Sequence, residues 1–341
     1  MSRVLRAAVI GCGAISERLH VPDYATCPDA EIAALCDKDA ARAKALAAKW
    51  APEAAIYTDY KKMLKEADLD CVTVTLPNFL HCQVTVDCLK AGLHTMVEKP
   101  MATTLAEARK MVETAKKADR LLLVNQTQRL IPAHMKAREV LQSGLLGKIL
   151  HVNGVFGHAG PDDWAPGADW FFRKKDAHFG AMADLGIHKA DLIRYVTGKE
   201  ITEITAFTAR LDKKGSVEDN FVSAIKFEDG TVGMLSASWT FYGQGDNYLI
   251  FHCEKGSLHV NWDPNAPCVG HIEHPAGRIE FEPPPPIEKY PESWGVDVSG
   301  HFAAACLGRE EPFCTGEEGM KSLQVILAAE KSASTGRSVK V

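Results

Sequence analysis

Two glycines near the N-terminus have the spacing that points most directly to chemistry. Gly11 and Gly13 follow an apolar run, and the small residue Ser16 stands where a third glycine would complete the pattern G-x-G-x-x-G. A strand, a glycine turn and a helix in this order bring backbone N–H groups and the positive end of a helix dipole to a pyrophosphate. A glycine pair after a strand also suits a plain tight turn, so the motif alone leaves both interpretations open.

An acidic residue lies at the distance that a dinucleotide site requires. Asp37 ends the second expected strand, where this type of fold places an acid on the adenosine ribose hydroxyls. Its carboxylate repels a 2′-phosphate, by about 1 kcal/mol in water and ~4 kcal/mol at an effective dielectric of about 20. We therefore expect NAD, although Lys38 and Arg42 could soften the preference and leave NADP open. Asp37 could instead only cap a helix.

Short strands and helices alternate around these residues. Helices between short apolar strands imply right-handed crossovers and a parallel sheet. The first 125 residues are thus predicted to form an α/β domain with a doubly wound parallel sheet that binds the cofactor. We expect strands at 6–10, 31–36, 70–76, 93–97 and 121–125, and helices at 15–24, 39–49, 59–66, 79–91 and 105–118.

The pattern changes after residue 125. Helices are expected at 131–143 and 184–196, and an amphipathic helix at about 317–334. Several strand-like segments follow one another without helices between them, which predicts an α+β domain over 126–341 with a large, mainly antiparallel open sheet. We expect its strands at 148–156, 201–210, 220–227, 232–239, 248–253, 257–261 and 278–281.

Composition excludes several classes of function. The 341 residues carry a net charge of −5, which gives no electrostatic reason to expect nucleic acid or an anionic membrane. No apolar run approaches ~20 residues, and the first residues leave no room for a targeting leader. The ten cysteines are scattered without a C-x-x-C pair, so we expect buried thiols and a cytoplasmic location.

Four groups of residues, in order and together, resemble the glucose–fructose oxidoreductase / inositol dehydrogenase (Gfo/Idh/MocA) family. They are 11–15, Thr75-Leu76-Pro77-Asn78 with His81, Glu98-Lys99-Pro100, and Asp184-Leu185-Gly186-Ile187-His188. Arg129, Gly144 and Gly147 of the linker and the turn at 334–337 also fit. The resemblance covers nearly the whole chain. It implies a Rossmann domain and an NAD(P)-dependent dehydrogenase or reductase that transfers hydride between nicotinamide C4 and a secondary carbinol or ketone.

The resemblance also implies three catalytic residues. Lys99 would lie by the nicotinamide and hydrogen-bond the reacting oxygen, as a buried ammonium can. His188 would exchange the hydroxyl proton as general base, since a neutral imidazole suits this work near neutral pH. Asp184 would hold a substrate hydroxyl, and positions i and i+4 of a helix share a face. Without the resemblance, Lys99 would read as a surface lysine, and the other two as a helix cap and a packed histidine.

The implied cofactor site draws on every strand end of the first domain. For His81, a capping or packing role stays equally open. The expected cofactor-binding residues are Gly11, Gly13, Ala14, Ile15, Asp37, Lys38, Thr75, Pro77, Asn78, His81, Glu98, Lys99 and Gln126.

The chain departs from the family before Asp184. The family commonly has Trp-Arg and then three glycines, whereas this chain has Trp170-Phe171 and then His178-Phe179-Gly180. Arg173, Lys174 and Lys175 lie close enough to replace the lost charge, and aromatic side chains could stack on a sugar or simply pack on the sheet. The substrate is a sugar, polyol or related cyclic compound in this interpretation. Its expected ligands are His158, Trp170, Phe171, Arg173, Asp184 and His188.

Other functions stay open at this point. The family includes glycosidases or lyases that oxidise their substrate transiently, and a non-catalytic regulator would also bind cofactor and sugar. No metal site is expected, because His158, His178, Asp184 and His188 match no zinc spacing. We expect a homodimer or homotetramer formed through the open face of the antiparallel sheet. Its alternating apolar residues would be Phe221, Ile225, Val232 and Leu235.

Overall fold

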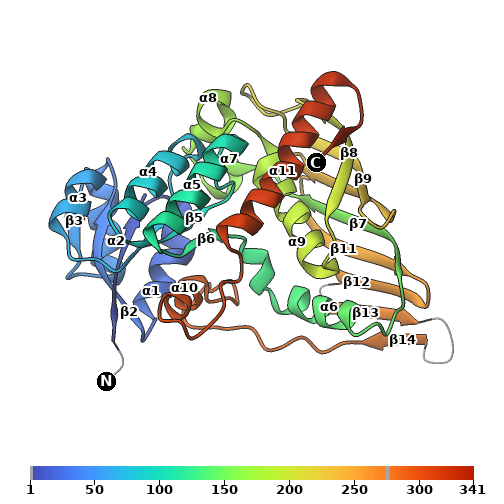
Figure 1. Cartoon of the computed structure of the whole chain (residues 1–341), viewed down its shortest axis with the longest axis horizontal. Coiled ribbons are helices and arrows are strands. Elements are labelled where there is room, and N and C mark those ends of the chain that lie inside the picture. The colour runs from blue at the N-terminus through green and yellow to red at the C-terminus, as the bar shows by residue number, and fades with distance from the viewer. Residues whose placement is uncertain (1–2, 264, 273–276) are drawn as a thin grey trace. The chain divides into compact units, whose positions relative to one another are not determined.

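The computed structural model describes residues 3–263, 265–272 and 277–341. These residues form two compact units, one of 1–127 with 286–320 and one of 128–285 with 321–341. The return of 286–320 to the first unit was not anticipated, since the sequence analysis assigned this segment to the second domain. Each unit contains one sheet (Figure 1).

The first unit contains a six-stranded sheet whose strands are all parallel. Its order is β3-β2-β1-β4-β5-β6, as in dinucleotide-binding folds. The order reverses between β1 and β4, so the crevice for a ligand lies at the carboxyl ends of these two strands. The strands are β1 (Leu5–Ile10), β2 (Ala30–Cys36), β3 (Ala55–Tyr57), β4 (Cys71–Val74), β5 (His94–Glu98) and β6 (Leu122–Asn125).

Helices connect the strands of this sheet. The expected helix at 15–24 is a π-helical segment, Ser16–His20, that continues into an α-helix. The helix α10 and the strand β3 were not predicted. The helices are α1 (Val21–Ala25), α2 (Ala40–Trp50), α3 (Tyr60–Glu66), α4 (Asn78–Lys90), α5 (Leu105–Ala118) and α10 (Val298–Cys306).

The second unit is built on a nine-stranded sheet in the order β14-β13-β12-β11-β7-β10-β9-β8-β15. Every described pair is antiparallel except β10 with β7. The strands are β7 (Ile149–Gly157), β8 (Ile201–Ala209), β9 (Asn220–Phe227), β10 (Val232–Ser238), β11 (Asp246–Cys253), β12 (Gly256–Asp263), β13 (Ala266–Ile272), β14 (Gly277–Glu280) and β15 (Val339–Lys340).

Longer helices α6 (Pro132–Gln142) and α9 (Ile187–Thr197) lie along one face of this sheet, next to it in Figure 1. Helix α11 (Gly316–Thr335) begins in the first unit and belongs to the second from residue 321. Short helices α7 (Pro161–Trp164) and α8 (Lys174–Ala177) lie in the loop after β7. The helix expected at 184–196 begins as a second π-helical segment, Met182–Gly186, before α9.

The sequence assigned the wrong residues to the open face of this sheet. Phe221, Ile225 and Leu235 are buried in the core beneath the helices, and only Val232 of the four is exposed. The open face instead carries the alternate residues, among them Val222 and Met234. In β9 the predicted residues Phe221 and Ile225 share one face, but that face is the core face. In β10 Val232 and Leu235 are three positions apart and therefore lie on opposite faces of the sheet.

Candidate active site

The glycine turn lies at the carboxyl end of β1, where the strand order reverses. Gly11 has φ +103°, and a Cβ there would lie 2.4 Å from the carbonyl oxygen of Thr75. A Cβ on Gly13 would meet no atom within 4 Å. The turn therefore needs glycine at residue 11 for its own conformation, while the backbone at residue 13 faces open space from which a ligand can approach.

Ser16 does more than fit a small space. Its hydroxyl donates to the carbonyl oxygen of Gly11 at 2.7 Å and lies 2.7 Å from the hydroxyl of Thr75. Thr75 also donates to the carbonyl of Gly11 at 2.8 Å. These bonds join the turn after β1 to the end of β4, so the two strands that border the crevice are held together there.

Asp37 lies at the end of β2 beside this turn. One carboxylate oxygen accepts the backbone N–H of Cys12 at 2.8 Å, and the other accepts the N–H of Asp39 at 2.9 Å. Asp39, not Asp37, caps α2, because its side chain accepts from Ala41. Asp37 thus supports the glycine turn directly, while Lys38 is exposed.

The residues after β4 and β5 are tied to one another. His81 is buried, with Nδ1 2.8 Å from the carbonyl oxygen of Pro100 and Nε2 2.6 Å from that of Leu76. Burial lowers the pKa of His81, so the ring is neutral and donates to one carbonyl at a time. This geometry favours the packing role that the sequence left open. Pro77 precedes α4, whose first residue Asn78 is buried.

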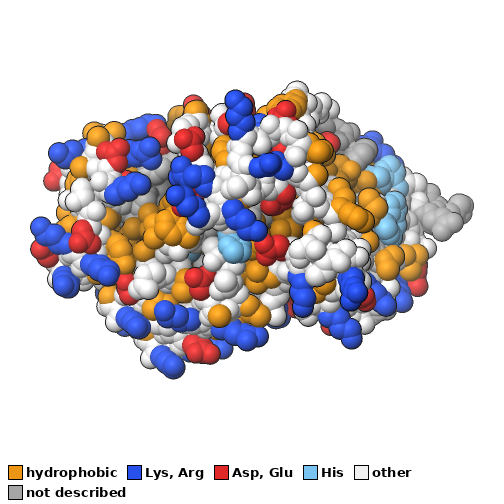
Figure 2. Space-filling view, turned by 90° about the horizontal axis from the view of Figure 1, so that it is seen from above, with side chains coloured by type: hydrophobic (Ala, Val, Ile, Leu, Met, Phe, Trp, Pro, Cys, Tyr) orange, Lys and Arg blue, Asp and Glu red, His pale blue; other side chains and the backbone are white. Residues whose placement is uncertain are grey.

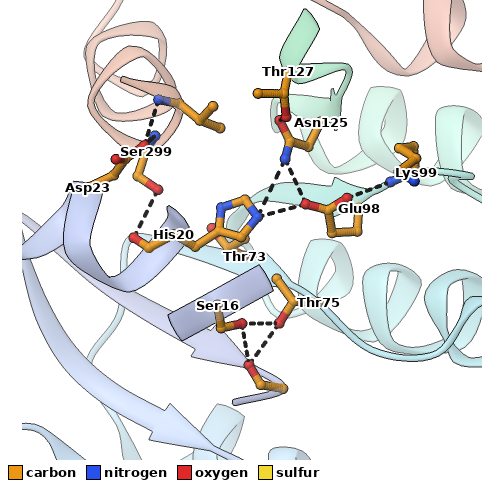
Figure 3. A network of polar contacts seen from close by, with 12 residues as sticks. Ser16, His20, Asp23, Thr73, Thr75, Glu98, Lys99, Asn125, Thr127 and Ser299 are labelled. Carbon is orange, nitrogen blue, oxygen red and sulfur yellow. Dashed lines mark hydrogen bonds and ion pairs between the residues drawn. The ribbon is translucent and has the colours of Figure 1, made fainter. Parts of the chain in front are cut away.

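Lys99 follows β5 directly and is half-buried. The preceding Glu98 is buried, and its two oxygens accept hydrogen bonds from His20, Asn125 and the backbone N–H of Lys99. Figure 3 shows these side chains around Glu98. The expected contact of Glu98 with the cofactor is therefore accompanied by a structural role that the sequence did not reveal.

The first unit fits a dinucleotide. Gln126 is buried after β6, and neither atom of its side-chain amide has a hydrogen-bond partner among the described residues. A buried amide requires a partner, and a bound ligand can supply one. The open backbone at Gly13 suits the approach of a pyrophosphate, and the carboxylate of Asp37 can accept hydrogen bonds from a ribose.

In the second unit, Asp184 lies in the π-helical segment and His188 in the first turn of α9, on one continuous helical stretch. Asp184 is buried and accepts a hydrogen bond from the indole N–H of Trp239 at 3.0 Å. Trp239 is fully buried after β10 and was missed by the sequence analysis. Its indole is a donor only, so it orients the side chain of Asp184 through this one hydrogen bond.

Phe156, also in the second unit, joins two of the expected substrate ligands. Its ring centroid lies 5.9 Å from that of His188 and 5.8 Å from that of His158. The backbone N–H of Gly160 donates to Nδ1 of His158 at 2.9 Å. These contacts place His158 and His188 against the same aromatic ring. Their role as substrate ligands stays a prediction.

The remaining expected substrate ligands lie in the loop that departs from the family pattern. Trp170 and Phe171 stack with centroids 3.9 Å apart, and Trp164 meets Phe171 edge-on at 5.5 Å. Both stacked rings are half-buried, so part of this aromatic group faces solvent. Arg173 is exposed and paired with Asp176 at 2.5 Å. The role of Arg173 as a substrate ligand stays a prediction.

Gly180 of this loop is required by its surroundings. A Cβ there would lie 1.8 Å from the carbonyl oxygen of Glu218. The Glu218 carboxylate accepts the N–H of Gly180 at 2.7 Å and that of Met182 at 3.1 Å, at the start of the π-helical segment. The last of the family's three glycines is thus retained because backbone packs against it.

The parallel sheet with its glycine turn, and the antiparallel sheet with its buried acid and histidine, define an NAD-binding oxidoreductase. A sequence profile described as "Oxidoreductase family, NAD-binding Rossmann fold" matches residues 5–126, and one described as "GFO/IDH/MocA C-terminal domain" matches residues 134–259. The chain belongs to the GFO/IDH/MocA family, which confirms the resemblance and both expected folds.

Named relatives cover most of the chain. D-glucoside 3-dehydrogenase of Escherichia coli is 32% identical over 256 residues, 70% of this chain and 71% of the relative. Myo-inositol 2-dehydrogenase of Thermotoga maritima is 27% identical over 345 residues, 99% of this chain and 98% of the relative. The crystal structure of aldose-aldose oxidoreductase from Caulobacter crescentus, complexed with glycerol, has TM-score 0.86 and 27% identity, covering 99% of this chain and 100% of that one.

None of the helices in the described residues combines the length and hydrophobicity of a membrane span. Within the same residues, no group of three or more His, Cys, Asp and Glu side chains could hold a metal ion. All ten cysteines are described and are free thiols.

Proposed function

We propose that this chain catalyses hydride transfer between NAD and a secondary carbinol or ketone of a sugar, a polyol or a related cyclic compound. Two relatives are a glucoside 3-dehydrogenase and a myo-inositol 2-dehydrogenase, whose names support this substrate class. The observation that carries the proposal is Lys99 directly after β5, at the sheet edge where the glycine turn also lies. Polar groups at that edge of a doubly wound sheet build its ligand site.

The chain's own residues would divide the proton chemistry. When bound, NAD supplies the hydride acceptor at nicotinamide C4. Lys99 would donate a hydrogen bond to the reacting oxygen and stabilise its alkoxide character, and His188 would take the hydroxyl proton at a ring nitrogen. Asp184, held by Trp239, would accept a hydrogen bond from a neighbouring substrate hydroxyl. The glycine turn, Asp37 and Gln126 would hold the cofactor.

The test is an absorbance screen at 340 nm with NAD and NADP separately, across sugars, inositols and sugar acids. On the best substrate, Lys99→Ala and His188→Ala should each lower turnover by ~10²-fold or more. Lys90→Ala is the matched control, since Lys90 is exposed at the end of α4 and has no expected role in the site. Near-normal turnover in both site variants, or product formed without net NADH, would contradict the proposed reaction.

We further propose that the chain self-associates through the open face of the nine-stranded sheet. Phe207 is 70% exposed, Met234 55% and Val222 52%, and the register brings Phe207 opposite Val222. Figure 2 shows hydrophobic side chains beside a group of histidines at one end of the molecule. Phe207→Glu should dissociate an assembly seen by light scattering. Lys226→Glu, on the same face of the sheet, reverses a charge without removing an apolar side chain and should leave the assembly intact.

The ten free thiols support a cytoplasmic location.

A further inference from the structure

A buried polar network of His20, Glu98, Asn125 and Thr127 lies next to Lys99 and has no part in the proton transfer of the proposed reaction (Figure 3). Nε2 of His20 donates to Oε1 of Glu98 at 2.8 Å, and Nδ2 of Asn125 donates to the same oxygen at 2.6 Å. Thr127 in turn donates to the amide oxygen of Asn125 at 3.0 Å. His20 is 0% exposed and Asn125 1%, so water competes for none of these bonds.

This network holds Glu98 as a carboxylate. Burial alone would raise the pKa of Glu98, but the hydrogen bond and charge of His20, the ammonium of Lys99 and the amide of Asn125 outweigh it and lower the pKa. The other oxygen accepts the backbone N–H of Lys99 at 3.1 Å. Glu98 therefore acts on Lys99 in two ways, because it fixes the backbone and places a negative charge near the ammonium.

The imidazole ring of His20 faces Glu98 through its Nε2 atom. Its Nδ1 has no hydrogen-bond partner among the described residues, so the polar contacts of the ring are made by Nε2, which lies 2.8 Å from Oε1 of Glu98 and 3.4 Å from Nδ2 of Asn125. The charged and titratable groups around the pair are Asp23 beside His20, and Lys99 and His81 beside Glu98. A residue that served only to fill space at 0% exposure would be expected to be apolar.

The π-helical segment that contains His20 also contains Ser16, which stabilises the glycine turn. His20 ends the π-helical segment that Ser16 begins, and Ser16 donates to the carbonyl of Gly11. Five residues thus connect the turn expected to bind NAD with the carboxylate that holds Lys99. π-Helical turns are costly and occur frequently at functional sites.

We propose that His20 is a positioning residue for Lys99: it acts through Glu98, holding that side chain in place so that one carboxylate oxygen keeps its bond to the Lys99 backbone and the carboxylate stays near the Lys99 side chain. The inference rests on the proposed function, because Lys99 has a substrate to be positioned against only if the chain catalyses that reaction. The link from His20 to the protonation of Lys99 can be measured without a substrate.

The experiment compares His20→Leu with His20→Gln in the full chain. Leucine removes the donor, whereas the glutamine amide can place an N–H near the position of Nε2. The first readout is NMR titration of ¹³C-labelled lysine, with the Lys99 signal assigned through Lys99→Arg. We expect His20→Leu to move the Lys99 titration midpoint to lower pH by about one unit, because Glu98 is then neutral over more of the pH range. His20→Gln should recover most of the shift.

The second readout is activity on the substrate found in the screen. His20→Leu should lower kcat about 10-fold and move the alkaline limb of the kcat/KM profile to lower pH, with the NAD Kd changed less than about threefold. Glu98→Gln keeps the size of the side chain and should reproduce the same shift, so it replaces His20→Leu if that variant does not fold.

The outcomes separate the two ideas. An unmoved Lys99 titration in both His20→Leu and Glu98→Gln overturns the inference, as does a fall in kcat with an unchanged pH profile. A shifted titration together with wild-type turnover in Lys99→Ala upholds the link from His20 to Lys99 and refutes the proposed function instead.

Discussion

Substituting the two glycines of the turn should separate fold stability from cofactor binding. In Gly11→Ala the new Cβ would lie 2.4 Å from the Thr75 carbonyl oxygen and 2.8 Å from its hydroxyl, at φ +103°. The backbone strain costs about 1–3 kcal/mol, and displacement of Thr75 weakens a buried hydrogen bond worth about 1 kcal/mol. We expect the unfolding free energy to fall by about 2–4 kcal/mol and Tm by about 5–15 °C.

Gly13→Ala should have the opposite signature. Its Cβ would meet no protein atom within 4 Å, so we expect a Tm close to that of the wild type. The added methyl group would stand where the backbone must approach the pyrophosphate. We therefore expect the NAD Kd to rise at least 10-fold, which corresponds to about 1.4 kcal/mol.

The assay combines differential scanning calorimetry with NAD titration by fluorescence. Gly92→Ala is the control, because Gly92 also has positive φ (+84°) but no atom lies within 4 Å of its added Cβ. It reports the cost of the conformation without a clash. A wild-type Tm for Gly11→Ala, or a wild-type NAD Kd for Gly13→Ala, would refute the assignment of these two roles.

Two further predictions concern buried side chains of the second unit. Trp239→Phe removes the N–H donor of Asp184. Since a hydrogen bond to a charged group is worth about 1.5–3 kcal/mol, kcat/KM should fall about 10- to 100-fold. Trp50→Phe is the control, because the indole N–H of Trp50 has no partner in the described part of the chain and Trp50 lies outside the candidate site; equal effects of the two variants would count against the role of Trp239. Burial lowers the pKa of Lys189 to about 7, below the value of about 10.4 in the unfolded chain. Between these two pH values the folded state binds fewer protons than the unfolded state, so the free energy of unfolding rises with pH across that window. Lys189→Met should raise the unfolding free energy near pH 7 by about 2–4 kcal/mol and flatten this slope in denaturant titrations; a less stable variant with an unchanged slope would contradict it.

The sequence predicted elements where the hydrophobic pattern was long and regular. The helix α5 was placed at its observed bounds, and β9 likewise, because their periodicity is clear and their ends carry strong signals. The three-residue strand β3 is too short to show alternation. The helix α10 was missed although Asp297 caps it by accepting from Gly300, since the preceding proline run suggested a loop.

The candidate site divides in the same way. The glycine turn, Asp37 and Lys99 were found because their spacing along the chain is fixed by local geometry, strand then turn then helix. Trp239 and His20 gave no such signal. Their partners Asp184 and Glu98 lie 55 and 78 positions away, and only the folded chain brings these pairs together.

Both missed contacts are made at π-helical segments where the sequence predicted regular α-helix. Periodicity cannot reveal such a segment, because one wider turn barely alters the pattern of apolar residues. The wider turn gives up regular backbone bonding, and a buried polar contact must offset that cost. In Ser16–His20 the bonds to Gly11 and Glu98 do so, and in Met182–Gly186 the bonds of Glu218 and Trp239 do so. If the bonds of one segment are removed, that segment should therefore return to α-helical hydrogen bonding. Glu98 should then move from its position when Ser16–His20 changes, and Asp184 when Met182–Gly186 changes. Local helix geometry is thus linked to the placement of the proposed catalytic groups.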